Sequence, residues 1–179
     1  MGSSARTITL ASGCFWRTEA VFERLEGVIS VECGYTNGFL AAPRYEQVCS
    51  GHTGHVEVVK LSYDPGRISL RQILEVFAAI DASAGADRMQ VDVGPQYRSG
   101  IYVDNDADAA LAAAVLADIE RCGGRPVEAE ICRRENYWPA EDYHRHFCGR
   151  HPHAGYCSLI VAPTVRRVQQ DFARLTGNR

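Results

Sequence analysis

The sequence predicts an α+β fold, with one sheet of mixed strands and helices packed on one of its faces. Two patterns carry this prediction: short segments of β-branched or alternating apolar residues, and longer segments with apolar residues about every 3.6 positions. These segments follow one another as β-α-β-β-α-β-α-β, without internal repeats. With 179 residues, the chain is long enough to bury a core without metal or disulfide support.

The first half of the chain supplies three strands and two helices. β-Branched residues predict a strand over 6–11, and an apolar stripe predicts a helix over 15–25. A second strand is predicted over 28–35 and leads into a loop. Residues 54–63 alternate cleanly up to an Asp-Pro-Gly turn, which predicts a third strand. The next helix is predicted over 69–80, with a serine as its N-cap.

The second half begins with residues 81–96, which are small or polar and are expected to form a surface loop. The same patterns then predict strands at 99–103 and 127–132 and helices at 106–121, 139–147 and 165–175. We expect the whole chain, 1–179, to be one domain. Its core is expected over about 6–150, and an irregular tail over 151–179.

The composition excludes several classes of function. Charged residues make up 23% of the chain and the formal net charge is −3, so no basic surface is expected for nucleic acid or for an anionic membrane. No apolar run approaches the roughly 18 residues of a membrane helix. The N-terminus lacks the apolar core of a signal peptide. A cytoplasmic protein is therefore expected.

The chain carries seven cysteines, an odd number with no Cys-x-x-Cys pair. A framework of structural disulfides is therefore not expected, whereas one or two reactive thiols among inert ones are. The cysteines are Cys14, Cys33, Cys49, Cys122, Cys132, Cys148 and Cys157.

Cys14 lies where the first strand gives way to a helix, in the stretch Gly-Cys-Phe-Trp. At a helix N-terminus, free backbone N–H groups and the helix dipole favour a thiolate. Cys14 is thus expected to have a lowered pKa and to react first with alkylating reagents. Phe15 and Trp16 could wall an apolar cup beside its sulfur. A small buried side chain in the core is the competing interpretation, and these residues alone do not decide between the two.

Glu57 interrupts the alternating apolar residues of the third strand. If it is buried, desolvation raises its pKa and keeps it protonated, as a general acid requires. Its alternation with Val56 and Val58 instead favours a position facing solvent. Tyr45 and Tyr97 each lie amid turn residues. Their hydroxyls either donate hydrogen bonds to a polar substrate atom or are half-exposed.

Histidines and cysteines cluster near the C-terminus, at His144, His146, Cys148, His151, His153 and Cys157. Their spacing fits no familiar zinc site and Pro152 interrupts the run, so no metal is expected. Cys157 follows a glycine and a tyrosine in the predicted tail. A mobile thiol there could swing onto another sulfur.

Several ordered blocks are similar to the methionine sulfoxide reductase A family, over about residues 7–157. The first block is Gly-Cys-Phe-Trp with a glutamate three residues on, a match to that family's nucleophile motif. The blocks are 13–19, 34–38, 45–51, 53–57, 63–65, 92–99, 135–144 and 155–157. The resemblance implies a ferredoxin-like α/β plait core. It also implies reduction of the S epimer of methionine sulfoxide, free or in proteins, with thioredoxin as reductant. We expect a monomer that needs no cofactor.

The resemblance assigns roles to single residues. The Cys14 thiolate would attack the sulfoxide sulfur while Glu57 delivers a proton to the departing oxygen. The resulting sulfenic acid would condense with Cys157, the resolving cysteine, to a disulfide. The other implied site residues are Tyr45 and Tyr97 as hydrogen-bond donors to the oxygen, Asp92 as an ordering group, and Phe15 and Trp16 at the substrate methyl.

The chain departs from the family in several places. The segment 81–91, beside the pocket in the family, differs in sequence, so a related enzyme acting on another sulfoxide or thiol is an alternative. No cysteine follows Cys157, so the family's three-cysteine relay is absent in its usual form. Cys148, at an unusual position, could compete as the resolving thiol. A redox switch without turnover is the third alternative.

Overall fold

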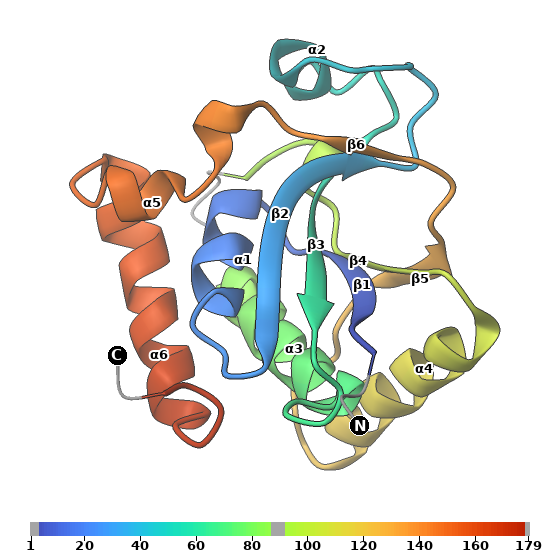
Figure 1. The fold of residues 1–179 in the computed structure, drawn as a ribbon, viewed down its shortest axis with the longest axis vertical. Helices are drawn as coiled ribbons and strands as arrows, with labels where there is room; N and C mark the ends of the chain where they lie inside the picture. The colour runs from blue at the N-terminus through green and yellow to red at the C-terminus, as the bar shows by residue number, and fades with distance from the viewer. Residues whose placement is uncertain (1–3, 87–91, 178–179) are drawn as a thin grey trace.

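The computed structural model describes residues 4–86 and 92–177. Within these ranges the chain forms a six-stranded sheet in the order β5-β4-β1-β3-β2-β6 (Figure 1). Neighbouring strands are antiparallel except β4 and β5, which run parallel, so the sheet is mixed as predicted. The strands are β1 (Arg6–Ala11), β2 (Val28–Thr36), β3 (Val56–Tyr63), β4 (Gly100–Val103), β5 (Glu130–Arg133) and β6 (Tyr137–Pro139).

Helices cover one face of this sheet and flank it. In Figure 1, α1 and α3 lie behind the central strands and α6 lies beside α1, while α2 stands apart from them. α4 packs against α3. The helices are α1 (Phe15–Phe22), α2 (Tyr45–Cys49), α3 (Leu70–Ala86), α4 (Asp106–Arg121), α5 (Phe147–Arg150) and α6 (Ala162–Asp171), with short turns η1 (Pro95–Tyr97), η2 (Asp142–His144) and η3 (Cys157–Val161).

Both faces of the central strand β3 are buried, and this decides the position of Glu57. Val59 and Leu61 pack in the main core beneath the helices. Val56 and Val58 belong to a smaller cluster on the opposite face. Glu57 alternates with these two valines, so it points towards the helices and is 1% exposed. Alternation therefore does not bring solvent contact in this strand.

α3 is longer than predicted and takes in part of the expected loop 81–96. It continues to Ala86, through an alanine-rich stretch that favours helix. Asp81 also accepts hydrogen bonds from two serine hydroxyls of neighbouring segments, which fixes this part of the helix. Residues 87–91, the rest of the segment that departs from the family, lie outside the described residues.

The helix predicted over 139–147 is wrong. β6 pairs there with β2, with Trp138 opposite Tyr35, and only the short turns η2 and α5 follow. The backbone at the start of this segment makes hydrogen bonds to the sheet. A continuous helix would have to give these bonds up.

The C-terminal tail is largely helical rather than irregular. The π-helical turn η3 runs directly into α6. Val165 and Val168 of α6 are buried, and α6 packs against α1. Beyond α6, Thr176 forms a β-bridge with Leu25. The segment expected to be mobile is therefore fixed to the core over most of its length.

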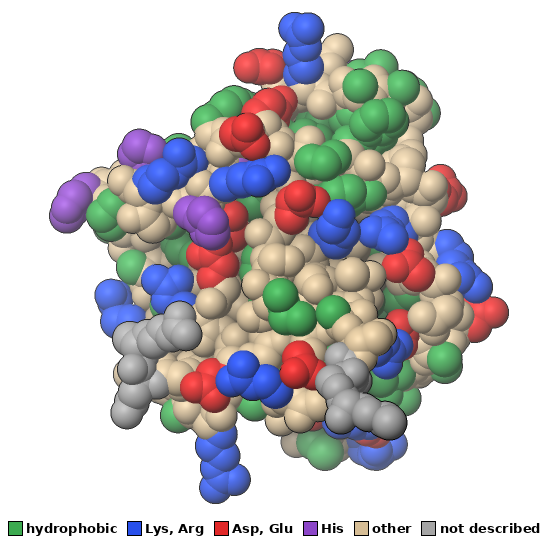
Figure 2. Space-filling view, viewed as in Figure 1, with side chains coloured by type: hydrophobic (Ala, Val, Ile, Leu, Met, Phe, Trp, Pro, Cys, Tyr) green, Lys and Arg blue, Asp and Glu red, His purple; other side chains and the backbone are tan. Residues whose placement is uncertain are grey.

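The surface carries charges of both signs. Acidic and basic side chains are interspersed on the face shown in Figure 2, in keeping with the formal net charge of −3. Across 4–86 and 92–177, no helix is long and apolar enough to cross a membrane.

Candidate active site

Cys14 lies between β1 and α1, where it is the N-cap residue of the helix with an extended backbone. The preceding Gly13 has a φ of +68°, and a Cβ there would lie 2.7 Å from both Asp92 Oδ2 and the guanidinium of Arg17. L-residues with a side chain rarely adopt such a φ. The turn that presents Cys14 therefore requires glycine for its backbone angle and for its space.

The first backbone amides at this helix end point at carboxyl groups. The N–H of Cys14 donates to Asp92 Oδ2 at 3.2 Å, and that of Phe15 donates to Glu57 Oε2 at 3.1 Å. The N–H of Trp16 donates to the Cys14 sulfur. The helix end thus binds two carboxyl groups as well as the thiol.

The pKa of Cys14 is raised well above its ordinary value, so the predicted lowering is wrong. Burial is the largest cause, and negative charge on Glu57 and Asp92 adds to it. Hydrogen bonds from the Trp16 N–H and the Tyr156 hydroxyl lower the pKa by smaller amounts. The prediction considered the helix end alone, without the two carboxyls that the fold brings to it. Cys14 is therefore a protonated thiol at neutral pH in this state.

Glu57 is buried on β3, and burial raises its pKa to about 8. The buried position is confirmed, and the position facing solvent is wrong. The Glu57 carboxyl is also in hydrogen-bond contact with the Cys14 thiol. A carboxylic acid able to release a proton near neutral pH thus lies beside the sulfur.

Two tyrosine hydroxyls meet at another cysteine in this site. Tyr45 begins α2 and Tyr97 ends η1, and both hydroxyls are in hydrogen-bond contact with the thiol of Cys49. Burial is the main cause that raises the pKa of each tyrosine, and the charge on Glu57 contributes to both. Both hydroxyls therefore stay protonated and can donate hydrogen bonds near Glu57.

Asp92 connects Cys14 to the C-terminal segment. Its Oδ2 accepts hydrogen bonds from the Cys14 N–H and, at 3.1 Å, from the Tyr156 hydroxyl. Arg17 Nη1 lies 3.9 Å from the same oxygen. Sequence reasoning did not select Tyr156, although it stands in the matched block 155–157. The ordering role expected of Asp92 stays a prediction.

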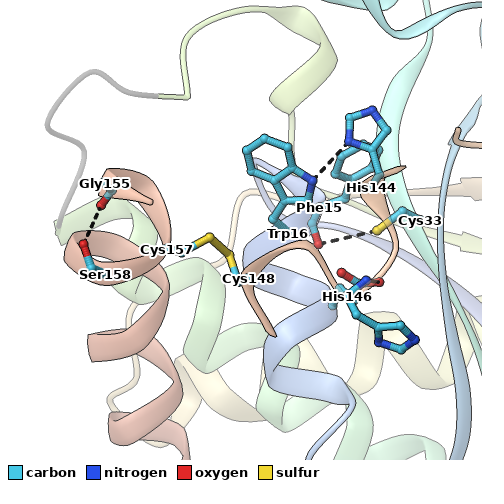
Figure 3. Close-up of a disulfide and its surroundings, with 10 residues drawn as sticks. Phe15, Trp16, Cys33, His144, His146, Cys148, Gly155, Cys157 and Ser158 are labelled. Carbon is cyan, nitrogen blue, oxygen red and sulfur yellow. Dashed lines mark hydrogen bonds between the residues drawn. A yellow bond between two sulfur atoms is a disulfide. The ribbon is translucent and has the colours of Figure 1, made fainter. Parts of the chain in front are cut away.

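Phe15 and Trp16 occupy different environments, although the sequence grouped them. Phe15 is 1% exposed, and its ring packs against Tyr35 and His144 in the core. Trp16 is half-buried, and its indole N–H donates to His144 Nδ1 at 3.1 Å (Figure 3). Its ring stacks on that of Phe147, with centroids 3.8 Å apart. Of the two, Trp16 is the one with accessible aromatic surface.

Glu141 and His144 support this side of the site. Glu141 accepts hydrogen bonds from the Tyr45 N–H and from the Tyr35 hydroxyl, each at 2.8 Å. Burial lowers the pKa of His144, so its neutral ring can accept the hydrogen bond from Trp16. Neither residue was predicted as part of the site. In the sequence, only their position in the matched block 135–144 pointed to them.

The two cysteines nearest the C-terminus form a disulfide, which the sequence did not predict. Cys148 on α5 and Cys157 at the start of η3 are bonded, with their Cα atoms 5.3 Å apart (Figure 3). Cys14, the partner that the resemblance implied for Cys157, is a free thiol here. The odd cysteine count argued against a disulfide framework but does not exclude one bonded pair. The other free cysteines are Cys33, Cys49, Cys122 and Cys132.

His146 has partners of its own, away from the disulfide in Figure 3. Its ring contacts the Glu23 carboxylate, and its backbone N–H donates to Glu19 at 3.0 Å. These three side chains offer ligand atoms within 4.8 Å of one another. All three already take part in these contacts.

Comparison with known proteins decides the family. A family model described as peptide methionine sulfoxide reductase matches residues 6–176. The chain belongs to this family. The peptide methionine sulfoxide reductase MsrA of Saccharolobus solfataricus is 42% identical over 164 residues, which cover 92% of this chain and 93% of the relative. That of Campylobacter jejuni (strain 81-176) is 41% identical over 166 residues, covering 93% of this chain and 99% of the relative.

Solved structures agree with this assignment. Mxr1 from Saccharomyces cerevisiae in reduced form matches with a TM-score of 0.73 and 28% identity, over 86% of this chain and 89% of that one. Methionine sulfoxide reductase A of Corynebacterium diphtheriae matches with a TM-score of 0.70 and 26% identity, over 84% of this chain and 76% of that one. Given relatives of 41 and 42% identity over nearly its whole length, the chain is a methionine sulfoxide reductase.

Proposed function

We propose that Cys14 is the nucleophile of this reductase and that Glu57 is its general acid. The contact between these two side chains carries the proposal. A carboxyl with a pKa of about 8 lies in hydrogen-bond contact with a buried thiol, at a turn that only glycine can make. Few structural needs explain an acid and a thiol buried side by side, whereas proton-coupled attack on a sulfoxide needs both.

The step conserves atoms and protons. The Cys14 sulfur attacks the sulfoxide sulfur, and the oxygen passes to Cys14 as the sulfur–oxygen bond of the substrate breaks. Glu57 gives its proton to that oxygen, and the proton of the Cys14 thiol returns to the carboxylate. The products are a thioether and a Cys14 sulfenic acid. Because Cys14 is a thiol before substrate binds, Glu57 acts as acid and base within one turnover.

The neighbouring residues support this step. The hydroxyls of Tyr45 and Tyr97, which contact Cys49 here, are proposed to turn to the sulfoxide oxygen when substrate enters. Asp92 fixes the amide of Cys14. Trp16 is proposed to contact the substrate methyl, with Phe15 beneath it as part of the core rather than as a contact surface.

We further propose that the S epimer of methionine sulfoxide is the substrate, free or in proteins, and that thioredoxin is the reductant. One solved structure is of Mxr1 in complex with Trx2, but at 21% identity that match bears on the fold alone. The reductant is therefore proposed from the family resemblance and from the disulfide. A single-domain monomer in the cytoplasm is proposed from the sequence. A ferredoxin-like core is supported by the central strand order β4-β1-β3-β2, with α1 and α3 as crossovers.

A stereo-resolved assay tests this function. Separate S and R epimers of a methionine sulfoxide peptide are supplied with dithiothreitol, and methionine is measured. The parent and the Cys122→Ser control are expected to reduce only the S epimer, and Cys14→Ser neither. Turnover by Cys14→Ser would overturn the role of Cys14. Reduction of the R epimer, or of unrelated sulfoxides in preference, would favour the divergent enzyme.

A further inference from the structure

Arg17 is a buried cation in the first turn of α1, close to the proposed nucleophile. Its backbone N–H donates to the Cys14 carbonyl oxygen at 3.2 Å, and its side chain is 5% exposed. The N-terminal end of a helix carries a partial positive charge, so a cation there is unfavourable. Burial adds a second cost unless the charge is paired. The position of Arg17 therefore requires compensation from the rest of the fold.

The guanidinium of Arg17 lies over the turn that presents Cys14. Its Nη2 donates to the Ser12 carbonyl oxygen at 2.7 Å, and a Cβ on Gly13 would lie 2.7 Å from the same nitrogen. Its Nε is buried and has no hydrogen-bond partner among the described residues. The hydrogen bond to Ser12 thus satisfies only part of the guanidinium, and it brings no negative charge to it.

Asp92 is the acidic residue that faces this cation. Its Oδ2 lies 3.9 Å from Arg17 Nη1, and the two side chains are only 18% and 5% exposed. Because both groups are largely withdrawn from water, their attraction is screened less than that of an ion pair at the surface. Asp92 therefore supplies the charge that the buried guanidinium requires, and the guanidinium in turn holds the Asp92 carboxylate beside the turn.

The same Asp92 oxygen makes two contacts that lead to the proposed nucleophile. It accepts hydrogen bonds from the Cys14 N–H at 3.2 Å and from the Tyr156 hydroxyl at 3.1 Å. The Tyr156 hydroxyl is also in hydrogen-bond contact with the Cys14 sulfur. A displacement of Asp92 would therefore disturb both the backbone of Cys14 and a donor to its thiol.

We propose that Arg17 is a positioning residue for sulfoxide reduction, an inference that rests on the proposed function of Cys14. Arg17 holds the Asp92 carboxylate in place. Asp92 then holds the Cys14 amide and the Tyr156 hydroxyl in the arrangement that attack on the sulfoxide needs. Because the Arg17 side chain is almost closed to solvent, its effect passes through Asp92 and not through contact with the substrate.

A double-mutant cycle on the first turnover tests this proposal. The rate of methionine release from pre-reduced chains is measured by rapid quench at several sulfoxide concentrations, without added reductant. Arg17→Gln is expected to lower the maximal rate at least ~10-fold and to leave the half-saturating sulfoxide concentration within about twofold of the parent. In the Asp92→Asn background, the same substitution is expected to change the rate by less than about twofold. Arg17→Lys keeps the positive charge and is expected to restore most of the rate.

Arg24→Gln is the matched control, because it removes the same charge at the other end of α1. The Arg24 guanidinium donates to a backbone carbonyl, that of Ala20, and the residue is exposed. This variant is expected to keep the parent rate. Three results would each overturn the proposal: a parent rate in Arg17→Gln, an equal loss in both backgrounds, or a rate in Arg17→Lys as low as in Arg17→Gln. An equal loss would mean that Arg17 only supports the turn through Ser12.

Denaturant unfolding tests the pair itself and does not depend on activity. Removing one charge leaves the other buried without a partner, whereas removing both does not. Arg17→Gln/Asp92→Asn is therefore expected to unfold at a higher denaturant concentration than Asp92→Asn, even if Arg17→Gln alone does not fold. A double variant less stable than Asp92→Asn would overturn the proposal. Failure of the proposed function is distinct, since the parent would then release no methionine while the order of stabilities stayed the same.

Discussion

Cys14 and Cys33 are two buried thiols on adjoining elements, and only one of them is proposed to react. They are 8% and 2% exposed, and burial raises the pKa of both well above the ordinary value. Burial therefore does not distinguish a nucleophile from a core residue. The direction of the hydrogen bonds does.

Cys33 acts as a donor, whereas Cys14 also acts as an acceptor. The Cys33 thiol donates to the backbone carbonyl of Phe15 at 4.0 Å and contacts the Glu19 carboxyl, which raises its pKa. The Cys14 sulfur accepts from the Trp16 N–H and the Tyr156 hydroxyl, which lower its pKa. Because donors stabilise an anionic sulfur and acceptors destabilise it, only the Cys14 environment can hold the negative charge that develops during attack.

The largest expected effect follows from removing the acid that Cys14 contacts. Glu57→Gln keeps the shape but has no proton to give, so we expect a loss of ~10²–10⁴-fold in the rate of sulfoxide reduction. The measurement is kcat with dithiothreitol from pH 5 to 9. In the parent, activity should fall as pH rises through about 8, where Glu57 loses its proton. A variant as fast as the parent at every pH would show that the contact has no catalytic role.

The same substitution should change stability in a pH-dependent way. The pKa of Glu57 is raised from 4.5 to about 8 by burial, so the folded chain holds a proton that the unfolded chain releases. The contribution of Glu57 to the free energy of unfolding is therefore complete below about pH 4.5 and is lost as pH rises through about 8. We expect Glu57→Gln to be more stable than the parent by up to about 5 kcal/mol above pH 8, and by far less at pH 5.

Glu141→Gln is the matched control for that experiment. Burial opposes ionisation of Glu141, but hydrogen bonds from its own backbone N–H, the Tyr45 N–H and the Tyr35 hydroxyl together lower its pKa. Its stabilising effect is therefore present above its unfolded pKa and lost in acid, opposite in sign to that of Glu57. Denaturant unfolding across pH measures both. If the free energy of unfolding depended on pH in the same way in the parent and in Glu57→Gln, the raised pKa of Glu57 would be contradicted.

Alkylation at neutral pH should separate exposed from buried thiols. The sequence led us to expect Cys14 to react first, and the structure reverses that order. Cys122 is exposed, whereas Cys14 is buried with a raised pKa. Since each unit of pKa lowers the thiolate fraction about tenfold, we expect Cys122 to be labelled at least ~10-fold faster than Cys14. Timed iodoacetamide labelling with peptide mapping measures this, and Cys14 labelled first would restore the low-pKa interpretation.

The smallest effect on activity is expected at Cys33. Cys33→Ala removes a buried thiol beside α1 but leaves every donor to Cys14 in place. We expect kcat within about twofold of the parent and a loss of ~1 kcal/mol in stability from the small cavity. Steady-state kinetics and denaturant unfolding measure the two quantities. A large fall in kcat with unchanged stability would mean that Cys33 takes part in the chemistry.

The sequence predicted much of this fold because local patterns were strong where tertiary contacts agreed with them. The strands around Cys14 and Glu57 and the turn at Gly13 follow from alternation and from glycine. Other features depend on distant partners. Asp92 reaches Cys14 across 78 positions, and this contact helps to reverse the expected pKa shift. Neither periodicity nor residue type at Cys14 carries that information.

The C-terminal region shows the same dependence on tertiary contacts. Pairing with β2 prevents the helix predicted over 139–147. The sequence of the C-terminal tail suggests an irregular segment, but its packing against α1 makes it helical. The bond between Cys148 and Cys157 depends on the positions that α5 and η3 take in the folded chain. The sequence did indicate that Cys148 was unusual, but not which sulfur it would meet.

The anchoring of the chain beyond α6 has a consequence for local opening of the fold. Beyond α6, Leu25 pairs with Thr176, and the Glu26 N–H donates to the Leu175 carbonyl oxygen at 2.7 Å. Amides of 149–153 should therefore exchange with solvent by local opening, while those of α6 exchange only in the larger unit that includes α1. Local opening of 149–153 would then disturb a few surface residues and leave α6 packed on α1. Such an opening would not expose the main core to aggregation.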